Sequence, residues 1–330
     1  MHTLILNAAP SGPRCQVALA ALKLPTLRRL LSLLSSTPVV RGAATDLTPV
    51  HERLLAASQS LISDGDKADG LIPWAAQDAR QRGLTAPPGQ SAQGGWAWIT
   101  PCHWTIQTDH VHMDDPQALA LTPHDADSLL RDMQPYFAED GITLLAGHVG
   151  LSHSHWLAHG RVFAGLPTAS LERVAGQVVD PWMPHQPQAQ SLRRLQNEMQ
   201  MLLYTHPVND ARARFRLPSV NAFWISGTGA LPDTQTTAPT APQPEECHVR
   251  KALQLPEQHD DAAAWVQAWE ALDSTTLAHA LLRLEQGHDV QITLCGANSA
   301  QTYTAQPLNT WQRLLRRLNP PHVTDILKAL

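Results

Sequence analysis

The feature that most constrains the fold is an α/β pattern that opens the chain and returns only near its end. The segment "TLILNAAP" (3–10) is a short apolar run followed by proline and glycine, which predicts a buried strand. In "CQVALAALKLPTLRRLLSLLSS" (15–36) leucines recur at helical spacing, and Pro25 divides the segment into two helices. A further helix is predicted over 49–62. A strand followed by helices indicates an α/β fold.

The same character reappears after a proline-rich linker. Residues 231–246 have no hydrophobic periodicity and hold four prolines. Residues 260–287 then form an amphipathic pattern that fits one long helix or a helix pair. A strand with a glycine turn is predicted over 288–300, and a last helix, "TWQRLLRRL", over 310–318. One domain is therefore predicted to be interrupted by another.

The middle of the chain reads as a smaller α+β module. "TAPPGQSAQGG" (85–95) is a natural junction, and the alternation from Trp96 onward predicts strands that place Trp96 with Trp98, and His110 with His112, on one face. A helix over 122–137 begins with the N-cap Thr122, and "ITLLAG" predicts a strand after it. The predicted division is 1–90 and 249–330 for the α/β domain, 91–230 for the α+β domain, and 231–248 for the linker.

Composition excludes several classes of function. The 330 residues carry 24 basic and 29 acidic side chains, a net charge of −5, without a block of like charge, so nucleic acid is not an expected partner. The four cysteines are far apart, which predicts neither a disulfide framework nor a zinc knuckle and favours a reducing compartment. Neither a signal peptide nor an apolar run long enough to span a membrane is present, so we expect a cytoplasmic protein without a membrane partner.

The segment "QNEMQMLLYTHPVND" (196–210) gathers polar groups at the end of a two-faced helix. Pro207 disfavours helical geometry at His206, so the helix is expected to stop there, with His206 as a C-terminal cap or as a catalyst. Asn209 is predicted to cap the next short helix, and Arg212 either to meet an anion or to extend into solvent.

Three segments in order carry a resemblance to a known family: "LTPHDADSLLRDM", "GITLLAGHVGLSHSHWLAHG" and "QNEMQMLLYTHPVNDARARFRLPSVNAFWISGTG". They resemble the middle domain of the archaeal-type cofactor-independent phosphoglycerate mutases, over about residues 120–230. Closer still, the chain looks like a proteobacterial family of regulatory proteins of the RpfE type. The resemblance implies a reduced alkaline-phosphatase-like α/β domain interrupted by a smaller α+β inserted domain.

The resemblance also implies a test of catalytic competence, because the mutases use two divalent metals and a phosphorylated serine. Where their first metal-binding aspartate ends the opening strand, this chain has Asn7, followed by Ala8. The region of the nucleophile offers Thr45 or Thr48. The segment "LCGANSA" stands where an Asp-His ligand pair would be, and Gly296 and Asn298 cannot hold Mn²⁺ or Zn²⁺ in its place. Asn7, Thr48 and Asn298 are thus the degenerate positions.

By the same resemblance, a set of polar and aromatic residues would line a cleft whose metal-binding half is lost: Asn197, Glu198, Gln200, His206, Asn209, Arg212, Asn221 and Trp224.

Histidines offer an alternative source of metal ligands. The chain has 17 of them, and His110, His112, His153 and His155 are spaced so that pairs could share an ion. Exposed or hydrogen-bonded histidines are the plainer interpretation. Cys102 beside His103 is not expected to be a nucleophile, because neighbours on a strand point to opposite faces.

The leading hypothesis is a degenerate, non-catalytic relative of phosphoglycerate mutase with a regulatory or ligand-binding role. It needs no cofactor and would bind a protein or a small phosphorylated ligand. The alternative is an active phosphoglycerate mutase or phosphatase that uses a divalent metal, Mn or Zn. A third hypothesis is a protein-interaction module that uses exposed residues among its 10 Trp.

Overall fold

The computed structural model describes residues 1–62, 69–87, 94–148, 154–231, 247–305 and 322–330. Residues 232–246 of the predicted linker, the predicted helix over 310–318 and His153 lie outside these ranges, whereas the predicted linker's last two residues, Cys247 and His248, belong to a strand. The chain divides into two compact units. Unit 1 comprises Met1–Ala44, Pro49–Gln59 and Thr240–Leu330, and unit 2 comprises Thr45–Thr48 and Ser60–Pro239.

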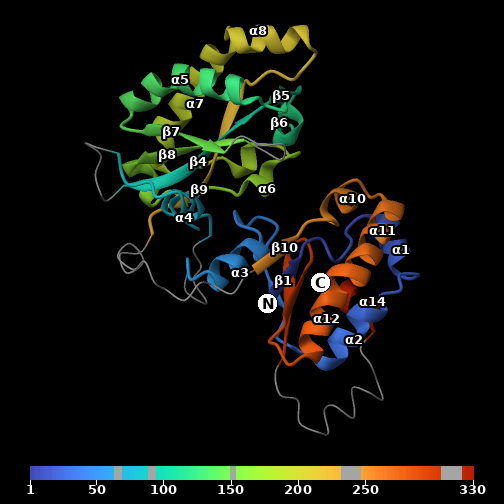
Figure 1. Ribbon diagram of the computed structural model, residues 1–330. Helices are drawn as coiled ribbons and strands as arrows, with labels where there is room; N and C mark the ends of the chain where they lie inside the picture. Colours follow the sequence, from blue (N-terminus) through green and yellow to red (C-terminus); the bar gives the residue numbers. More distant parts are fainter. Residues whose placement is uncertain (63–68, 88–93, 149–153, 232–246, 306–321) are drawn as a thin grey trace. The chain divides into compact units, whose positions relative to one another are not determined.

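Unit 1 is built on a mixed sheet with the strand order β10-β1-β11-β12-β2. Figure 1 labels two neighbouring strands of this sheet, β10 and β1. Strand β1 (His2–Ile5) pairs in parallel with both β10 (Cys247–Arg250) and β11 (Gln291–Cys295). Strand β12 (Ser299–Thr304) returns antiparallel to β11 and also pairs with the short strands β2 (Ser35–Ser36) and β3 (Val40–Arg41). The first and last parts of the chain therefore share one sheet.

Apolar side chains alternate between the two faces of this sheet, and helices cover both. One face carries Ile5, Ile292 and Leu294 and packs against leucines and tryptophans of the helices. The other face, with Leu4 and Leu6, packs against α3 (Val50–Ser58). The remaining helices of unit 1 are α1 (Pro13–Leu19), α2 (Pro25–Leu33), α10 (Gln254–Gln258), α11 (Ala262–Leu272), α12 (Ala278–Glu285) and α14 (Val323–Ala329).

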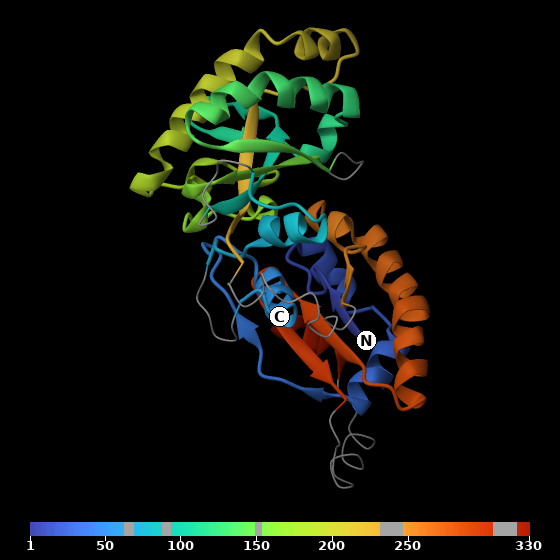
Figure 2. The same cartoon turned by 60° about the vertical axis from the view of Figure 1, so that its left-hand side comes forward.

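The sequence allowed either one helix or a helix pair over 260–287, and the structure has one continuous helical segment there. Helix α11 begins at the N-cap Asp261 and passes through a π-helical turn, Asp273–Leu277, into α12 (Figure 2). The π-turn holds the buried Asp273, whose carboxylate accepts hydrogen bonds from the backbone amides of Thr26 (3.1 Å) and Leu27 (2.8 Å) at the start of α2. An acidic group at a helix N-terminus satisfies amides that have no intrahelical partner.

Unit 2 is built on an antiparallel sheet with the order β7-β8-β4-β9. Its strands are β4 (Gly95–Cys102), β7 (Thr143–His148), β8 (His155–Gly160) and β9 (Ala222–Gly229). Helices α5 (Pro123–Glu139) and α7 (Gln190–Tyr204) cover one face over a large apolar core. Helix α4 (Trp74–Gln81) covers the other face.

A two-stranded hairpin of β5 (Trp104–Ile106) and β6 (Val111–Met113) extends unit 2, together with α6 (Leu171–Val174) and α8 (Pro207–Arg214). Short 3-10 turns complete the unit at Pro116–Leu119, Arg161–Ala164, Asp180–Trp182 and Pro187–Ala189. The expected N-cap of α5 is present, since Thr122 Oγ1 accepts from the amide of Asp125 at 3.1 Å.

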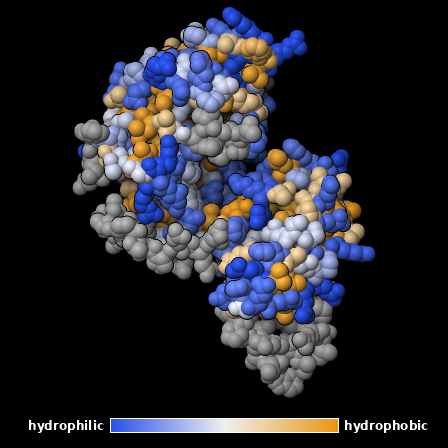
Figure 3. Space-filling view, in the orientation of Figure 1, coloured by the Kyte–Doolittle hydropathy of each residue, from blue (hydrophilic) through white to orange (hydrophobic). Residues whose placement is uncertain are grey.

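The hypothesis of an interaction module with exposed tryptophans is wrong for the described part of the chain. All nine described tryptophans are buried or half-buried. The large apolar side chains that are exposed are of other types, such as Met201, Tyr204 and Phe215. Hydrophilic residues cover most of the face in view in Figure 3, with hydrophobic residues scattered among them. Among the described residues, no helix is both long and apolar enough to cross a membrane.

Candidate functional site

Asn7 lies just past the end of β1, at the edge of the sheet where the parallel strands β1 and β11 both finish. The amide of Ala8 donates to the carbonyl of Cys295 at 2.7 Å, which brings Asn7 beside the start of the 296–298 turn. Asn7 has a φ of +53°, a left-handed conformation that asparagine tolerates better than most residues. Asn7 and the 296–298 turn therefore lie at the same edge of the unit 1 sheet.

A buried carboxylate from a distant part of the chain closes this edge. Glu257, on α10, is only 7% exposed. Its Oε2 accepts from Asn7 Nδ2 at 3.1 Å, and its Oε1 accepts from the backbone amide of Ser11 at 2.9 Å and also from the Ser11 hydroxyl. The indole nitrogen of Trp265 donates to the Asn7 carbonyl at 3.4 Å. Glu257 is thus hydrogen-bonded through both oxygens.

The next carboxylate on the same segment caps helix α1. Asp260 accepts from the backbone amides of Arg14 and Cys15 at 3.0 to 3.1 Å. These amides, Cys15 first, hold the pKa of Asp260 below its ordinary value. Gly12 permits this contact, because a Cβ there would lie 2.2 Å from the Asp260 carboxylate oxygen Oδ1. The loop between β1 and α1 is therefore fixed by a segment about 245 residues away in the sequence.

The 296–298 turn joins the antiparallel strands β11 and β12. The amide of Gly296 donates to the carbonyl of Ser299 at 2.8 Å, and the carbonyl of Asn298 accepts from the amide of Gly42 at 2.8 Å. A Cβ on Gly296 would lie 2.7 Å from the carbonyl oxygen of Leu330. The turn is packed against backbone and presents neither a carboxylate nor an imidazole.

Thr48 belongs to unit 2, where its hydroxyl accepts a hydrogen bond from a backbone amide. Thr48 is 3% exposed, and its Oγ1 accepts from the amide of Gly70 at 2.8 Å. The Asp69 carboxylate accepts from the amides of Leu47 and Thr48, both at 2.8 Å. Asp69 and Gly70 were not identified from the sequence as partners of this segment.

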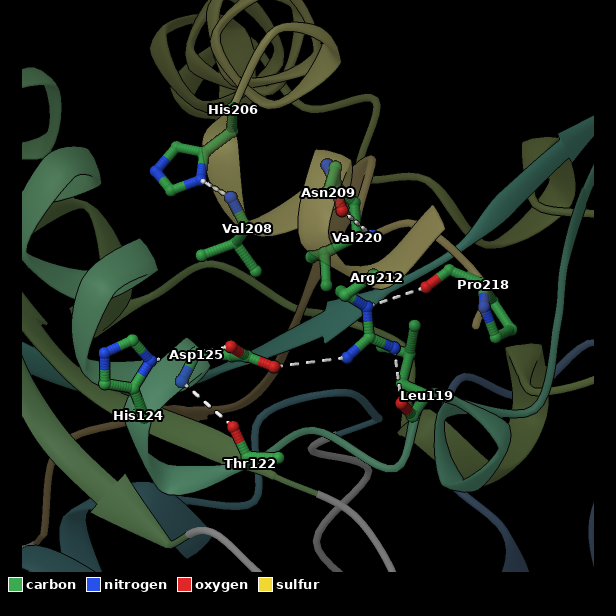
Figure 4. A network of polar contacts seen from close by, with 10 residues as sticks. All are labelled: Leu119, Thr122, His124, Asp125, His206, Val208, Asn209, Arg212, Pro218 and Val220. Carbon is green, nitrogen blue, oxygen red and sulfur yellow. Dashed lines mark hydrogen bonds and ion pairs between the residues drawn. The ribbon is translucent and has the colours of Figure 1, made fainter. Parts of the chain in front are cut away.

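His206, Asn209 and Arg212 follow the end of α7, and Figure 4 shows their polar contacts. His206 does not cap the end of α7; it is the N-cap of α8, and its Nδ1 accepts from the amide of Val208 at 3.2 Å. Its Nε2 lies 2.9 Å from Asp132 Oδ2. Both ring nitrogens are thus engaged by protein groups.

Asn209 is not an N-cap, because α8 already begins at Pro207. Its amide nitrogen donates to the carbonyls of Leu203 (2.7 Å) and Val220 (2.8 Å), and its oxygen accepts from the amide of Val220 (2.8 Å). The side chain, 9% exposed, therefore ties the end of α7 to the segment before β9.

Arg212 is 2% exposed and does not extend into solvent. It donates to the carbonyls of Pro218 (2.8 Å) and Leu119, and its NH1 lies 3.6 Å from Asp125 Oδ2 (Figure 4). Burial lowers the pKa of this guanidinium, and the neighbouring Asp125 opposes that effect. Arg212 therefore connects α8 with α5 and with the chain before it, as a structural cation.

The other predicted cleft-lining residues are also dispersed or bound to the protein. Asn197 is exposed on α7, and Glu198 and Gln200 are half-buried there. Asn221 accepts from the amide of Trp104 and donates to its carbonyl, at 2.7 and 2.8 Å. Trp224 is buried and donates to the carbonyl of Ala169 at 3.0 Å. None of the predicted residues lines the small pocket bounded by Pro101, Pro116, Gln117, Leu119, Ala120, Leu121 and Ser154.

The described candidate histidines occupy separate positions. His110 contacts the exposed Asp109 at 2.6 Å, and His112 lies 3.6 Å from Asp114. His155 Nε2 lies 3.4 Å from Asp78 on α4. Among the described residues, none of the three belongs to a trio of His, Cys, Asp or Glu ligand atoms within 4.8 Å of one another. Cys102 is buried, and burial raises the pKa of its thiol, which suits a structural cysteine.

Comparison with known proteins gives remote similarities only. No protein-family model and no curated protein matches the chain. The PH0037 protein from Pyrococcus horikoshii is similar in structure with a TM-score of 0.46 and 13% identity, over 92% of this chain and 87% of that chain. A cofactor-independent phosphoglycerate mutase from Thermoplasma acidophilum has a TM-score of 0.39 and 13% identity, over 99% of this chain and 98% of that chain. At this distance neither structure establishes a family for the chain.

Proposed function

We propose that this chain is a non-catalytic relative of the cofactor-independent phosphoglycerate mutases that acts by binding, not by chemical turnover. The proposal starts from the resemblance of residues 120–230 to the middle domain of those enzymes. It extends to an alkaline-phosphatase-like ancestry for unit 1 and a regulatory role for the whole chain.

The observation that carries the proposal is the hydrogen bond from Asn7 to Glu257. A metal ligand must present a lone pair to the ion, and Mn²⁺ and Zn²⁺ prefer carboxylate or imidazole ligands to a neutral amide. Asn7 presents an N–H donor to Glu257 at 3.1 Å, because the ionised carboxylate can only accept. The residue that stands at the strand end is therefore turned toward a protein acceptor and is neutral.

Glu257 does not supply the missing charge to an ion. Its two oxygens already accept from three donors on Asn7 and Ser11, and the side chain is 7% exposed. Moving it toward an ion would break its hydrogen bonds with the half-buried Asn7 and with Ser11. The neighbouring 296–298 turn offers Gly, Ala and Asn. The residues at this edge do not fit a pair of divalent metals.

The Asn7–Glu257 contact suits a former catalytic site whose residues now only stabilise the fold. The fixed β1–α1 loop would keep one shape, and a partner would recognise that shape without transferring a group. We propose that the partner is a protein or a small phosphorylated ligand, and that the protein acts in the cytoplasm without nucleic acid.

A direct assay of turnover tests the proposal. Purified full-length protein is incubated with 3-phosphoglycerate and Mn²⁺, and 2-phosphoglycerate is followed by phosphorus NMR, with an active cofactor-independent mutase as the positive control. We expect no conversion above the protein-free reaction. Mn²⁺-dependent conversion that disappears in Asn7→Ala would instead support the alternative of an active metal-dependent mutase.

A further inference from the structure

Strand β7 lies at an edge of the unit 2 sheet. It is first in the order β7-β8-β4-β9, and among the described residues it pairs with β8 alone. Residues 142–147 (ITLLAG) carry no charge and include no proline, and Leu145 is half-buried while Ala146 is exposed. An edge strand of this composition is a template for pairing with another strand, and natural sheets usually block such an edge with lysine, proline or a covering segment.

Two side chains from other elements occupy backbone groups on this edge. Gln134 Oε1, on α5, accepts from the amide of Leu144 at 2.9 Å. The guanidinium of Arg82, just after α4, donates to the carbonyl of Ala146 at 2.8 Å. Because α5 and α4 cover opposite faces of the sheet, the edge is reached from both sides.

The other outward-pointing groups of β7 follow from strand geometry. Since the amide of Leu144 donates to Gln134, the backbone of Leu144 points away from β8, and the backbone of the next residue, Leu145, points toward its partner Leu157. The carbonyl and the following amide of a trans peptide point to opposite sides. The carbonyl of Leu144 and the amide of Ala146 therefore also point outward.

This outward set of two amides and two carbonyls is complementary to itself. If a second copy of β7 lies antiparallel, with the two Leu145 residues opposite each other, then Leu144 of each copy faces Ala146 of the other. Each Leu144 amide would donate to an Ala146 carbonyl, and each Ala146 amide would donate to a Leu144 carbonyl. The edge thus has the hydrogen-bonding pattern needed to pair with a second copy of the chain.

Gln134 and Arg82 occupy the donor and the acceptor of one of these two kinds of bond. With both side chains in place, the two-fold pairing loses half of its hydrogen bonds. The two side chains also fill space that the second strand needs, because paired strands lie about 4.8 Å apart. We propose that Gln134 and Arg82 hold closed a strand edge through which two copies of this chain would otherwise pair.

Sedimentation equilibrium of the full chain over a series of concentrations tests this inference. The double variant Gln134→Met, Arg82→Met retains the length of both side chains but removes the acceptor and the donor. Its dimer association constant should exceed that of the wild type by at least about tenfold. Arg131→Met, at an exposed position of α5, is the matched control and should behave as the wild type.

A third substitution shows whether the gained association uses the β7 edge. Ala146→Pro removes the outward amide, and proline is tolerated where the amide of an edge strand points away from the sheet. Added to the double variant, it should return the association constant to the wild-type value. Equal association of the wild type and the double variant, or association that survives Ala146→Pro, would overturn the inference.

If circular dichroism shows that the double variant does not fold, Arg82→Met is used alone, because Arg82 is exposed. Leu145→Cys then reports the pairing, since opposed residues at this position would lie about 4.5 Å apart between Cα atoms, within reach of a disulfide. We expect a disulfide-linked dimer on mild oxidation of Leu145→Cys with Arg82→Met, in about tenfold higher yield than with Arg82 present. Equal yields in the two backgrounds would contradict the inference.

Discussion

Acidification should weaken unit 1 through a single buried residue, His2. The His2 side chain is on the interior strand β1 and is 6% exposed. Its Nε2 lies 2.9 Å from Thr293 Oγ1, which in turn lies 2.9 Å from Thr302 Oγ1. Hydroxyl groups can satisfy a neutral imidazole but cannot balance a charge. Burial, and then the nearby N-terminal amino group, lowers the pKa of His2 from 6.5 to about 4.

The sign and size of the effect follow from this difference. The unfolded chain binds the proton below pH 6.5, whereas the folded chain resists it until about pH 4. The contribution of His2 to the unfolding free energy is therefore fully present above its pKa in the unfolded chain. It is lost as the pH falls toward the pKa of His2 in the folded chain. Between pH 7.5 and pH 4.5 the loss attributable to His2 is about 2.5 kcal/mol.

Urea denaturation of the wild type and of His2→Gln at a series of pH values measures this term. The glutamine amide can still reach a hydroxyl partner but does not titrate in this range. The difference in unfolding free energy between the two proteins should shift by about 2.5 kcal/mol in favour of the variant from pH 7.5 to pH 4.5. Parallel pH profiles for the two proteins would refute the account of His2.

Three further substitutions test the polar contacts. Asn209→Ala should lower the unfolding free energy of unit 2 by about 2–4 kcal/mol because buried backbone groups lose their partners; the exposed Asn197→Ala on α7 is the control, with a change within about 0.5 kcal/mol in the same denaturation assay. Asp273→Ala should cost unit 1 about 1–2 kcal/mol through loss of the α2 cap, and an unchanged denaturation midpoint would disprove the cap. Asn7→Asp should destabilise unit 1 at pH 7.5, since two carboxylates would face each other at the Glu257 contact, and urea melts should show the loss shrinking at pH 5; a loss independent of pH contradicts like-charge repulsion.

Local sequence signals predicted the elements well where neighbouring residues decide the structure. The prolines at 25 and 123 and the cap Thr122 marked helix starts that the structure contains. The opening strand is shorter than predicted, ending at Ile5, because the chain must turn at Asn7 to reach Glu257. Strands β8 and β10 were not predicted; the short β10 is half-buried throughout and lacks a clear alternation of burial.

The site was harder to predict because its contacts join distant residues. The roles of His206 and Asn209 were predicted from adjacent residues in the sequence alone. Their actual partners, Asp132 for His206 and Leu203 and Val220 for Asn209, are distant in sequence or lie in another element, so the alternatives of cap and catalyst could not be separated. Glu257 was missed altogether. Its segment has no motif. Glu257 lies 250 residues from Asn7 in the sequence, and it has a role only because the fold brings the two side chains together. A buried carboxylate of this kind has no sequence signal beyond being an acid near apolar positions.

The metal content of the purified protein distinguishes a non-catalytic chain from a metal-dependent mutase. The full-length protein is purified without chelator, dialysed against metal-free buffer, and analysed for Mn, Zn and Fe alongside an Asn7→Ala variant. We expect less than stoichiometric metal in the wild type and the same low content in the variant, because Asn7 donates to Glu257 and cannot serve as a ligand. One or two equivalents of Mn or Zn that survive dialysis in the wild type and are lost in Asn7→Ala would contradict this expectation.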